Sequence, residues 1–574
     1  MHNESQDIAA PSSSTWLPRR RTALGLGALA VSLTGLAACG GSGGASSVDP
    51  SEKRALALPT YVAPEVPEGG IVSEVEGMPT IFVQPVAEED YFQSVDEAPG
   101  DGETELTSFQ YLWGSPPRSR GDNPSWQEFE KQMGVTWNPI LTAVEGYDDK
   151  VSTTVASGDI PDLMFVDPST PSGLSSMQDG AFADLSEVLA GDNVLQWPNL
   201  ANIPEGAWKA TALNGHLLGI PNENPYLNNL PVFRKDLVEL AGHEDLGSNA
   251  DEFLQVLIDI GALKTAHGKQ IWAIPALTRD YHKIFEWVYR AGTNWQLDDS
   301  GSVINVRQTE GFAKALEAEA TLWKEGAIHP DAFSGGLDEL WGNGQTAVWS
   351  GSFGGIFGVG LDNLLASTPE AEVEWMIPPA FDGGDLLVDR DDGAWGIVAI
   401  SSAAAEDEQR LHTLLDIVNW WRAPYGSKEA LFIKNGIEGV HFEFDEDSNI
   451  ITLDDEQAGV DHSALNWLGV SHSPTYTVPA RQAEHADGFR IAQETYISLA
   501  EPSAVLGMMA PSASRLNAKL EQIDDDYRNA IVTGRKGLDA IEEYRAEWLG
   551  GGGQTLIDEY DELHREMRPP LPVE

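Results

Sequence analysis

Between residues 105 and 169, short apolar runs alternate with helical stretches, and this alternation constrains the fold more than any other feature. The runs "ELTSFQYLWG", "VTWNPILTAV" and "PDLMFVDPS" are typical of strands, while "SWQEFEKQMG" and "YDDKVSTTVASGD" have helical spacing. Strand–helix–strand repeats at such short intervals predict a parallel, doubly wound sheet. Ligands bind beyond the carboxyl ends of the strands in these sheets, so Trp113, the "SPPR" loop and Asp167 form a candidate site.

The N-terminus carries an export pattern around the chain's single cysteine. Three arginines, Arg19 to Arg21, precede an apolar run that ends in "LAAC", Leu36 to Cys39. The run is shorter than the ~20 apolar residues of a membrane span. "LAAC" resembles the lipobox of bacterial lipoproteins, in which the signal is cut before a cysteine that then receives lipid. A plain secretory signal with an incidental cysteine is the alternative. The "RRTAL" stretch leaves both the twin-arginine and the general export route open.

Composition limits the function classes that need to be considered. One cysteine excludes an intramolecular disulfide and a cysteine-ligated zinc site, so stability must come from packing. With 35 Lys and Arg against 90 Asp and Glu, the formal net charge is −55, which repels nucleic acid and anionic lipid. The 18 tryptophans belong either to the core or to platforms for sugar rings.

A search for catalytic and metal-binding motifs returns little. A P-loop, an HExxH pair and a GxSxG elbow are absent from the body, and the many carboxylates prevent a glycosidase pair from being identified. "DEDSNIITLDDE", residues 445–456, has oxygen ligands at several calcium-loop positions but Ile450 where Gly is required. We therefore interpret it as a polar hairpin turn, and we expect no metal and no cofactor.

Six segments in order resemble the family 1 extracellular solute-binding proteins of ABC importers, in particular their oligosaccharide-uptake lipoprotein branch. They include "YDDKVSTTVASGDIPDLMFVD", "LNGHLLGIPN", "VFRKDLVELAG" with "NADEF", and "LWKEGAIHPDAF" followed by "WGNGQTAVWSG". "YGSKEALFIKNGIEGVHF" and the C-terminal "YRNAIVTGRKGLDAIEEYRAEWLGGGGQTLIDEYDE" complete the set. The resemblance covers residues from about 85 to 574.

The resemblance implies a two-lobed periplasmic-binding-protein-like α/β fold with hinge crossovers and a helical C-terminal region. The predicted organisation, in chain order, is a lipoprotein signal peptide at 1–39, a flexible tether at 40–56, a Pro/Glu/Gly-rich extension at 57–105, a first lobe of 106–225 plus about 350–420, and a second lobe of 226–350 plus about 420–574. The extension is interpreted as draped on the body, with free disorder as the alternative.

Candidate ligand-binding residues follow from strand ends and residue type. Those in the first predicted lobe's chain segments are Trp113, Arg118, Asp167, Asn222, Glu223 and Trp395. Those in the second predicted lobe's segments are Trp287, Trp349 and Trp467, and Ser350 and Ser352 lie at the predicted boundary near residue 350. Trp420 and Trp421 follow helical apolar spacing and are expected to be core. Cys39 is the expected lipidation site.

The favoured function is an anchored receptor that captures a carbohydrate, expected to be an oligosaccharide, between its lobes and presents it to the transmembrane permease subunits of an ABC importer. It is expected to act as a monomer on the outer face of the cell membrane, without nucleic acid and without breaking bonds in its ligand. Two alternatives remain open at this stage: a receptor for a peptide or other solute, and an exported glycoside-active enzyme.

Overall fold

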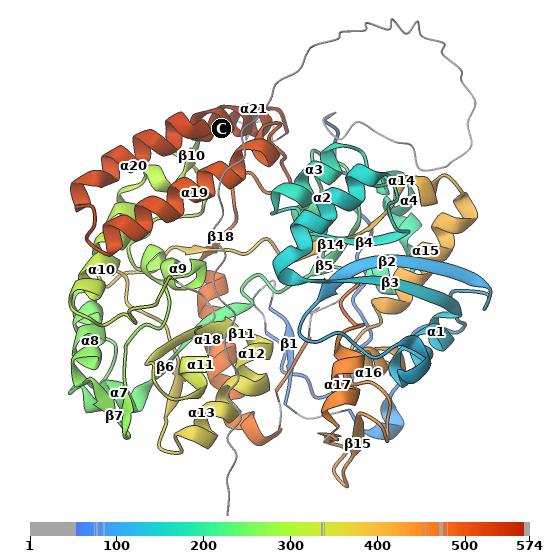
Figure 1. The fold of residues 1–574 in the computed structure, drawn as a ribbon, viewed down its shortest axis with the longest axis horizontal. Coiled ribbons are helices and arrows are strands. Elements are labelled where there is room, and N and C mark those ends of the chain that lie inside the picture. The colour runs from blue at the N-terminus through green and yellow to red at the C-terminus, as the bar shows by residue number, and fades with distance from the viewer. Residues whose placement is uncertain are drawn as a thin grey trace, which may run out of the picture. The chain divides into compact units, whose positions relative to one another are not determined.

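The computed structural model describes residues 53–567, apart from 74, 76–77, 84–85, 334–336, 338, 454, 470–474 and 479. The predicted signal peptide, Cys39 and nearly all of the predicted tether lie outside the described residues. Within the described part the elements gather around two sheets, which form the two lobes seen to the right and left of Figure 1. In the part of the chain that can be described, we find no helix long and apolar enough to cross a membrane.

The first lobe is built on a five-stranded sheet with the order β3-β2-β4-β14-β5. Its strands are β2 (Thr104–Leu112), β3 (Val135–Ala143), β4 (Leu163–Val166), β5 (Ile220–Glu223) and β14 (Ala394–Ile400). β2 pairs in parallel with β3 and β4, whereas β14 runs antiparallel to β4 and β5. The predicted parallel β-α-β-α-β unit is confirmed. The carboxyl ends of β2 and β4 and the start of β14 therefore share one edge.

Local signals define the two helices of this unit. α1 (Pro124–Met133) begins where the Asn123 side chain accepts a hydrogen bond from the Trp126 backbone N–H, and it ends at Gly134, whose φ of 65° suits glycine. α2 (Tyr147–Ser157) carries Asp148 in its first turn, where a negative charge suits the helix dipole.

Further helices cover the two faces of the five-stranded sheet. They are α3 (Pro171–Gln178), α4 (Ser186–Leu189), α5 (Pro198–Ala201), α6 (Glu205–Thr211), α14 (Ser402–Ala405), α15 (Glu408–Trp421), α16 (Lys428–Asn435) and α17 (Glu456–Ser463). Phe129 of α1 stacks on Trp421 of α15 with ring centroids 5.2 Å apart, and Trp420 is also buried. The prediction that both tryptophans are core is confirmed.

The second lobe is centred on a three-stranded antiparallel sheet with β6 (Asn229–Arg234) between β11 (Val348–Ser352) and β12 (Val373–Trp375). Its helices are α7 (Lys235–Leu240), α8 (Ala250–Leu263), α9 (Arg279–Val288), α10 (Glu310–Lys324), α11 (Glu339–Gly342), α12 (Phe353–Gly355), α13 (Leu361–Ser367), α18 (Ala486–Ser498), α19 (Ala513–Val532), α20 (Ile541–Trp548) and α21 (Gln554–Met567). The C-terminal helical region is confirmed.

Two chain segments pack differently from the predicted division of residues 350–574. β12, expected in the first lobe, pairs with β6 of the second. Conversely, Phe432, Leu465 and Leu468, expected in the second lobe, lie in the apolar cluster that also contains Leu106 of β2. The reason is that the chain crosses between the lobes again after Trp467, and the local sequence pattern does not predict that crossing. The remaining predicted boundaries stay predictions.

The described part of the N-terminal extension packs against the body. β1 (Thr80–Phe82) pairs in parallel with β17 (Thr475–Thr477), the strand between α17 and α18. The Ser73 hydroxyl donates to Glu494 of α18 at 2.7 Å, and the backbone N–H groups of Ser94 and Val95 donate to Glu429 of α16. The draped arrangement is therefore what the described residues of this segment adopt.

The segment considered as a calcium loop is a hairpin between β15 (Phe442–Phe444) and β16 (Ile450–Thr452). The Asp445 carboxylate accepts hydrogen bonds from the backbone N–H groups of Asp447 and Asn449, which closes the turn. The interpretation as a hairpin is confirmed. Among the described residues, no group of three or more His, Cys, Asp and Glu side chains is arranged to hold a metal ion.

Candidate functional site

Three of the predicted ligand-binding residues lie at the same edge of the five-stranded sheet. Trp113 follows the last residue of β2, Asp167 follows the last residue of β4, and Trp395 is the second residue of β14. Because β2 and β4 are parallel and β14 is antiparallel to β4, these three positions come together even though they span 282 residues of sequence.

A β-bulge positions Trp395. Ala394 pairs with Glu223 and Gly396 pairs with Asn222, so Trp395 is an extra residue in β14 without a partner on β5. Gly396 is needed here, because a Cβ at this position would come within 2.5 Å of the Phe165 ring. Because Gly396 has no side chain, the Phe165 ring can occupy this space, and its centroid lies 4.5 Å from that of the Trp395 ring.

Tyr111, Trp113, Trp395 and Trp467 form a contiguous set of rings, which we call the aromatic platform. The Trp467 ring centroid lies 5.7 Å from that of Trp113 and 6.3 Å from that of Trp395. Tyr111 lies 5.8 Å from Trp113 and 6.3 Å from Trp395, with its plane nearly parallel to Trp395. Trp113 is the most open member, with 47% of its surface exposed.

Two members of the platform carry polar atoms without a partner in the described structure. The indole N–H groups of Trp395 and Trp467 are buried, and no acceptor for either is found among the described residues. A buried indole N–H normally finds an acceptor, because leaving it without one costs free energy. The pair is therefore suited to an acceptor that arrives with a ligand, such as a sugar hydroxyl.

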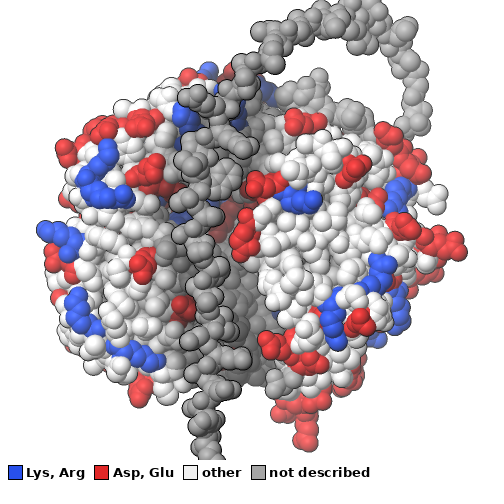
Figure 2. Space-filling view, in the orientation of Figure 1, with Lys and Arg blue, Asp and Glu red and all other residues white. Residues whose placement is uncertain are grey.

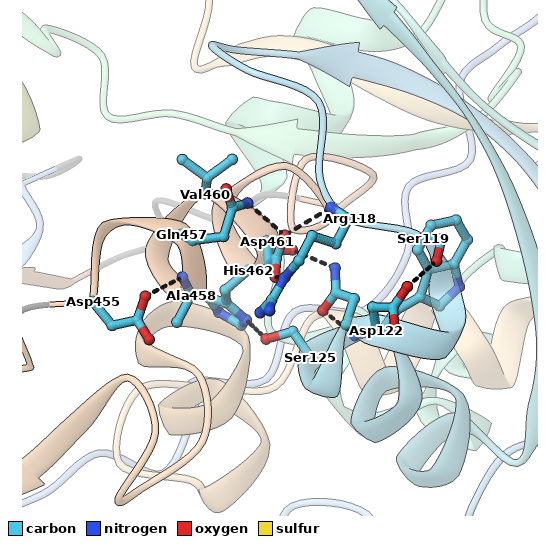
Figure 3. Close-up of polar contacts among 12 residues, drawn as sticks. Arg118, Ser119, Asp122, Ser125, Asp455, Gln457, Ala458, Val460, Asp461 and His462 are labelled. Carbon is cyan, nitrogen blue, oxygen red and sulfur yellow. Dashed lines mark hydrogen bonds and ion pairs between the residues drawn. The ribbon is translucent and has the colours of Figure 1, made fainter.

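Arg118, predicted to bind ligand, instead connects two segments that carry the platform. Its backbone N–H donates to the Asp461 carboxylate at 2.8 Å, and its guanidinium pairs with the same carboxylate (Figure 3). Asn123 adds a hydrogen bond from its side-chain amide to the Asp461 backbone carbonyl. Asp461 itself is fully buried. The loop after Trp113 is thereby joined to α17, which precedes Trp467.

A buried chain of hydrogen bonds supports α17 beside this ion pair. The Ser125 hydroxyl lies 3.0 Å from Nδ1 of His462 (Figure 3). It also lies 3.1 Å from Nε2 of His441. Nδ1 of His441 accepts from the Ile437 backbone N–H, and Nε2 of His462 faces the Ile433 carbonyl. Both imidazoles are therefore neutral, with the proton on Nε2. Burial and the neighbouring His441 lower the pKa of His462 to about 4, and burial lowers the pKa of His441.

Asp167 sits beside the platform in a crowded acidic environment. Burial raises the pKa of its carboxyl group, and the nearby Asp148 carboxylate raises it further. Hydrogen bonds from Ser169 and the charge of Arg279 act in the opposite direction. Burial also raises the pKa of the Tyr111 hydroxyl, with added contributions from Asp167 and Asp148. Asp167 thus lies at the platform's edge of the sheet, and its charge interacts with that of Arg279, the first residue of α9 in the second lobe.

The remaining predicted residues are not part of this group. Asn222 and Glu223 are buried and bind Arg422, the C-cap of α15, through a 3.2 Å hydrogen bond and an ion pair. Trp287 is buried and donates its indole N–H to Asp389 at 2.6 Å.

Trp349, Ser350 and Ser352 are residues of β11 itself, where they pair with β6, so the prediction of a loop at these positions is wrong. Trp349 is buried and stacks on Trp341 with centroids 5.6 Å apart, Ser350 is buried with its backbone N–H toward the Tyr281 hydroxyl, and Ser352 caps α12 by accepting from the Gly355 N–H. The structure therefore gives these three residues structural contacts within the second lobe, and a role in ligand binding stays a prediction for them.

Sequence reasoning missed Tyr111, Asp148, Arg279, Asp392 and Glu521, which surround the platform or its charges. Tyr111 could have been found from the alternation along β2. Asp148 and Arg279 lie in the first turns of α2 and α9, Glu521 lies in the middle of α19, and Asp392 lies in a segment between the lobes. The local sequence carries no distinguishing signal at these positions.

No protein-family model matches the chain, but two curated relatives and several solved structures are similar to it. The chain is 22% identical over 482 residues to lipoprotein LipO of Bacillus subtilis, covering 79% of this chain and 91% of LipO. It is 21% identical over 473 residues to the polygalacturonan/rhamnogalacturonan-binding protein YtcQ of the same organism, covering 79% and 89%.

Solved structures with the same fold are also found. The alginate-binding protein AlgQ2 aligns with a TM-score of 0.60 at 15% identity, over 82% of this chain and 99% of AlgQ2. The ABC-transporter substrate-binding protein FusA of Streptococcus pneumoniae, in complex with kestose, aligns with a TM-score of 0.58 at 15% identity, over 81% and 99%. The expected resemblance is confirmed: the chain has the two-lobed fold of extracellular solute-binding proteins and is related in sequence to binding lipoproteins of that kind.

Proposed function

We propose that this protein captures an oligosaccharide on the aromatic platform between its two lobes and delivers it to an ABC importer. The observation that carries the proposal is the convergence of Trp113, Trp395 and Trp467 at the sheet edge where ligands bind in open α/β folds. Sugar rings present flat C–H faces that pack on aromatic planes, while their hydroxyl groups seek polar partners. Asp167 and the two indole N–H groups supply such partners beside the rings.

The relatives support a binding role. YtcQ and AlgQ2 are named for the polysaccharides that they bind, and FusA was solved with a bound oligosaccharide. We propose that this chain, like them, holds its ligand without cleaving it. A peptide receptor on the same scaffold and a glycoside-active enzyme are the competing functions that the experiment below must exclude.

We further propose that Cys39 carries lipid and holds the protein on the outer face of the cell membrane. The relationship to lipoprotein LipO and the "LAAC" sequence support this anchor. The anchored protein would act as a monomer and would meet the permease subunits through its two lobes.

The proposal is tested by isothermal titration of the purified full-length chain with a panel of oligosaccharides. We expect one-to-one binding without any shortened product. Trp113→Ala and Trp395→Ala should each weaken binding at least about tenfold, as for a central aromatic contact. The matched control is Trp323→Ala, since Trp323 of α10 packs on Phe333 in the second lobe, away from the platform.

The competing functions give different results. If Trp113→Ala and Trp395→Ala both bound the oligosaccharide with unchanged affinity, the proposal that sugar rings stack on these tryptophans would be wrong. Binding of peptides but of no sugar would favour the peptide receptor, and release of shorter sugars would indicate an enzyme.

A further inference from the structure

Three carboxylates lie on chain segments that adjoin the aromatic platform, and a fourth comes from the second lobe. Asp148 follows Tyr147, whose ring centroid lies 3.8 Å from that of Tyr111. Asp167 follows β4, Asp148 lies in the first turn of α2, and Asp392 precedes β14. Glu521 of α19 comes from the second lobe, yet the charge of Asp148 in the first lobe helps to raise its pKa after burial and Asp525. Figure 2 shows acidic side chains along the hollow between the lobes.

The positive charges near these carboxylates do not balance them. Arg279, the first residue of α9, is the cation shared by Asp167, Asp392 and Glu521, because its charge lowers the pKa of each. Lys283, one turn further along α9, also lowers the pKa of Asp392, but it is paired with Asp389 at 3.2 Å and Asp391 at 2.9 Å. Arg307 lowers the pKa of Glu521 and is itself paired with Asp524.

Two carboxyl groups beside the strands that carry the platform, Asp392 before β14 and Asp167 after β4, have raised pKa values. Burial raises the pKa of Asp392, and the neighbouring Asp391 raises it further. Asp167 is affected in the same direction by burial and Asp148. Burial is the largest cause for both groups and the neighbouring carboxylate adds to it, so a further anion placed beside them would meet both desolvation and repulsion.

From this charge distribution we infer that the platform accepts uncharged oligosaccharides and rejects oligosaccharides built of uronic acids. The inference rests on the proposed function and narrows its ligand class. A uronate residue would bring one carboxylate per sugar into a region that already holds more negative than positive charge. Repulsion at separations of several ångströms costs about tenfold in affinity for each such group at the dielectric constants that apply near protein surfaces. Neutral sugars avoid this cost, and their hydroxyl groups donate hydrogen bonds to the same carboxylates.

The test compares two matched pairs on the full-length chain: mannotetraose with tetramannuronate, and cellotetraose with its uronate counterpart. The members of each pair share their linkage and differ only at C6. In each pair whose neutral sugar binds, we expect the affinity for the neutral sugar to be at least about tenfold higher than the affinity for the uronate at low salt. Raising the salt concentration should reduce that ratio, because screening weakens repulsion but leaves neutral binding unchanged.

Two variants test whether uronates are rejected by charge repulsion or by the shape of the site. Replacing Asp167→Asn and Asp392→Asn together should lower the neutral-to-uronate affinity ratio at least about tenfold. Asp159→Asn is the matched control, because Asp159 is an exposed residue that precedes β4 and lies toward the opposite end of the strand from Asp167.

The outcomes distinguish this inference from the function on which it rests. The inference would be overturned if a uronate bound as tightly as its neutral partner. It would also be overturned if the neutral-to-uronate affinity ratio changed neither with salt concentration nor in the double Asp167→Asn, Asp392→Asn variant. Neither result would contradict the proposed function as an oligosaccharide receptor. Failure of every neutral and acidic sugar to bind, with binding of peptides, would overturn both.

Discussion

The carboxylate of Asp461 accepts hydrogen bonds from both the backbone N–H and the guanidinium of Arg118. One buried side chain on α17 thereby fixes the loop that follows Trp113, 343 residues earlier in the chain. This ion pair therefore contributes to the relative position of Trp113 and Trp467, together with the hydrogen bonds of Asn123 and Ser125.

We expect Asp461→Asn to weaken oligosaccharide binding although Asp461 is not a platform residue. An amide keeps one acceptor but loses the charge, so the loop and α17 are held less firmly, at a cost of about 1–3 kcal/mol in folding free energy. The measurement is a titration with the best neutral ligand, alongside chemical denaturation. Glu130→Gln is the control, since it breaks the 3.1 Å pair with Arg120 without involving α17. Full affinity in Asp461→Asn would mean that the platform does not need this connection.

Glu223→Gln should lower the free energy of unfolding by about 3–5 kcal/mol, because it removes the counter-charge of the buried Arg422 guanidinium. Chemical denaturation measures the effect. The comparison is Glu205→Gln, which breaks a 2.6 Å pair with Lys209 whose two side chains are about half exposed, and which should cost under about 1 kcal/mol. Equal effects of the two substitutions would contradict the structural role assigned here to Glu223.

The stability of the protein should fall between about pH 6.5 and pH 4 because of His462. Its pKa is about 4 when folded and 6.5 when unfolded, so the unfolded state takes up a proton in this window and the folded state does not. The folded state loses about 2–3 kcal/mol by pH 4.5 from this group. Unfolding free energies at pH 7.5 and 4.5 should differ less in His462→Gln than in the unaltered protein. His412→Gln, which alters a histidine packed on Trp197, should keep the full difference; an unchanged difference in both variants would argue against His462.

Cys39→Ser should release the protein from membranes without changing ligand affinity, because a serine offers no thiol for lipid attachment. Fractionation of cells followed by titration of the released protein checks both parts. Ser42→Ala in the predicted tether should leave the protein with the membrane. Membrane retention of Cys39→Ser would refute the lipid anchor.

Local sequence pattern was sufficient to predict the parallel strands β2, β3 and β4 and the edge where Trp113 and Asp167 meet, because each of these residues follows a recognisable strand. It did not predict that β14 joins the same sheet in the antiparallel direction and brings Trp395 to that edge. It was insufficient for Asn222, Glu223 and Trp349. Their polar or aromatic character suits a ligand site, but each is engaged by a residue distant in sequence or packing, such as Arg422 beneath β5 and Trp341 beside β11.

The charges around the platform could not be predicted for a related reason. Asp148, Arg279 and Glu521 lie on helices from different lobes, and only the packing of those lobes makes their charges act on one another. Any chain with 90 acidic residues offers many such carboxylates, so composition alone does not single these out.

The pairing of β1 with β17 has a practical consequence for how the protein is produced. β17 belongs to a two-stranded sheet, and Ile81 and Phe82 of β1 are buried beside it. A chain cut just before Thr104 would expose the edge of β17 together with the apolar surface that those side chains cover. Bare strand edges recruit the edges of other molecules. We therefore expect a preparation that starts near residue 53 to stay dispersed and one that starts at Thr104 to aggregate.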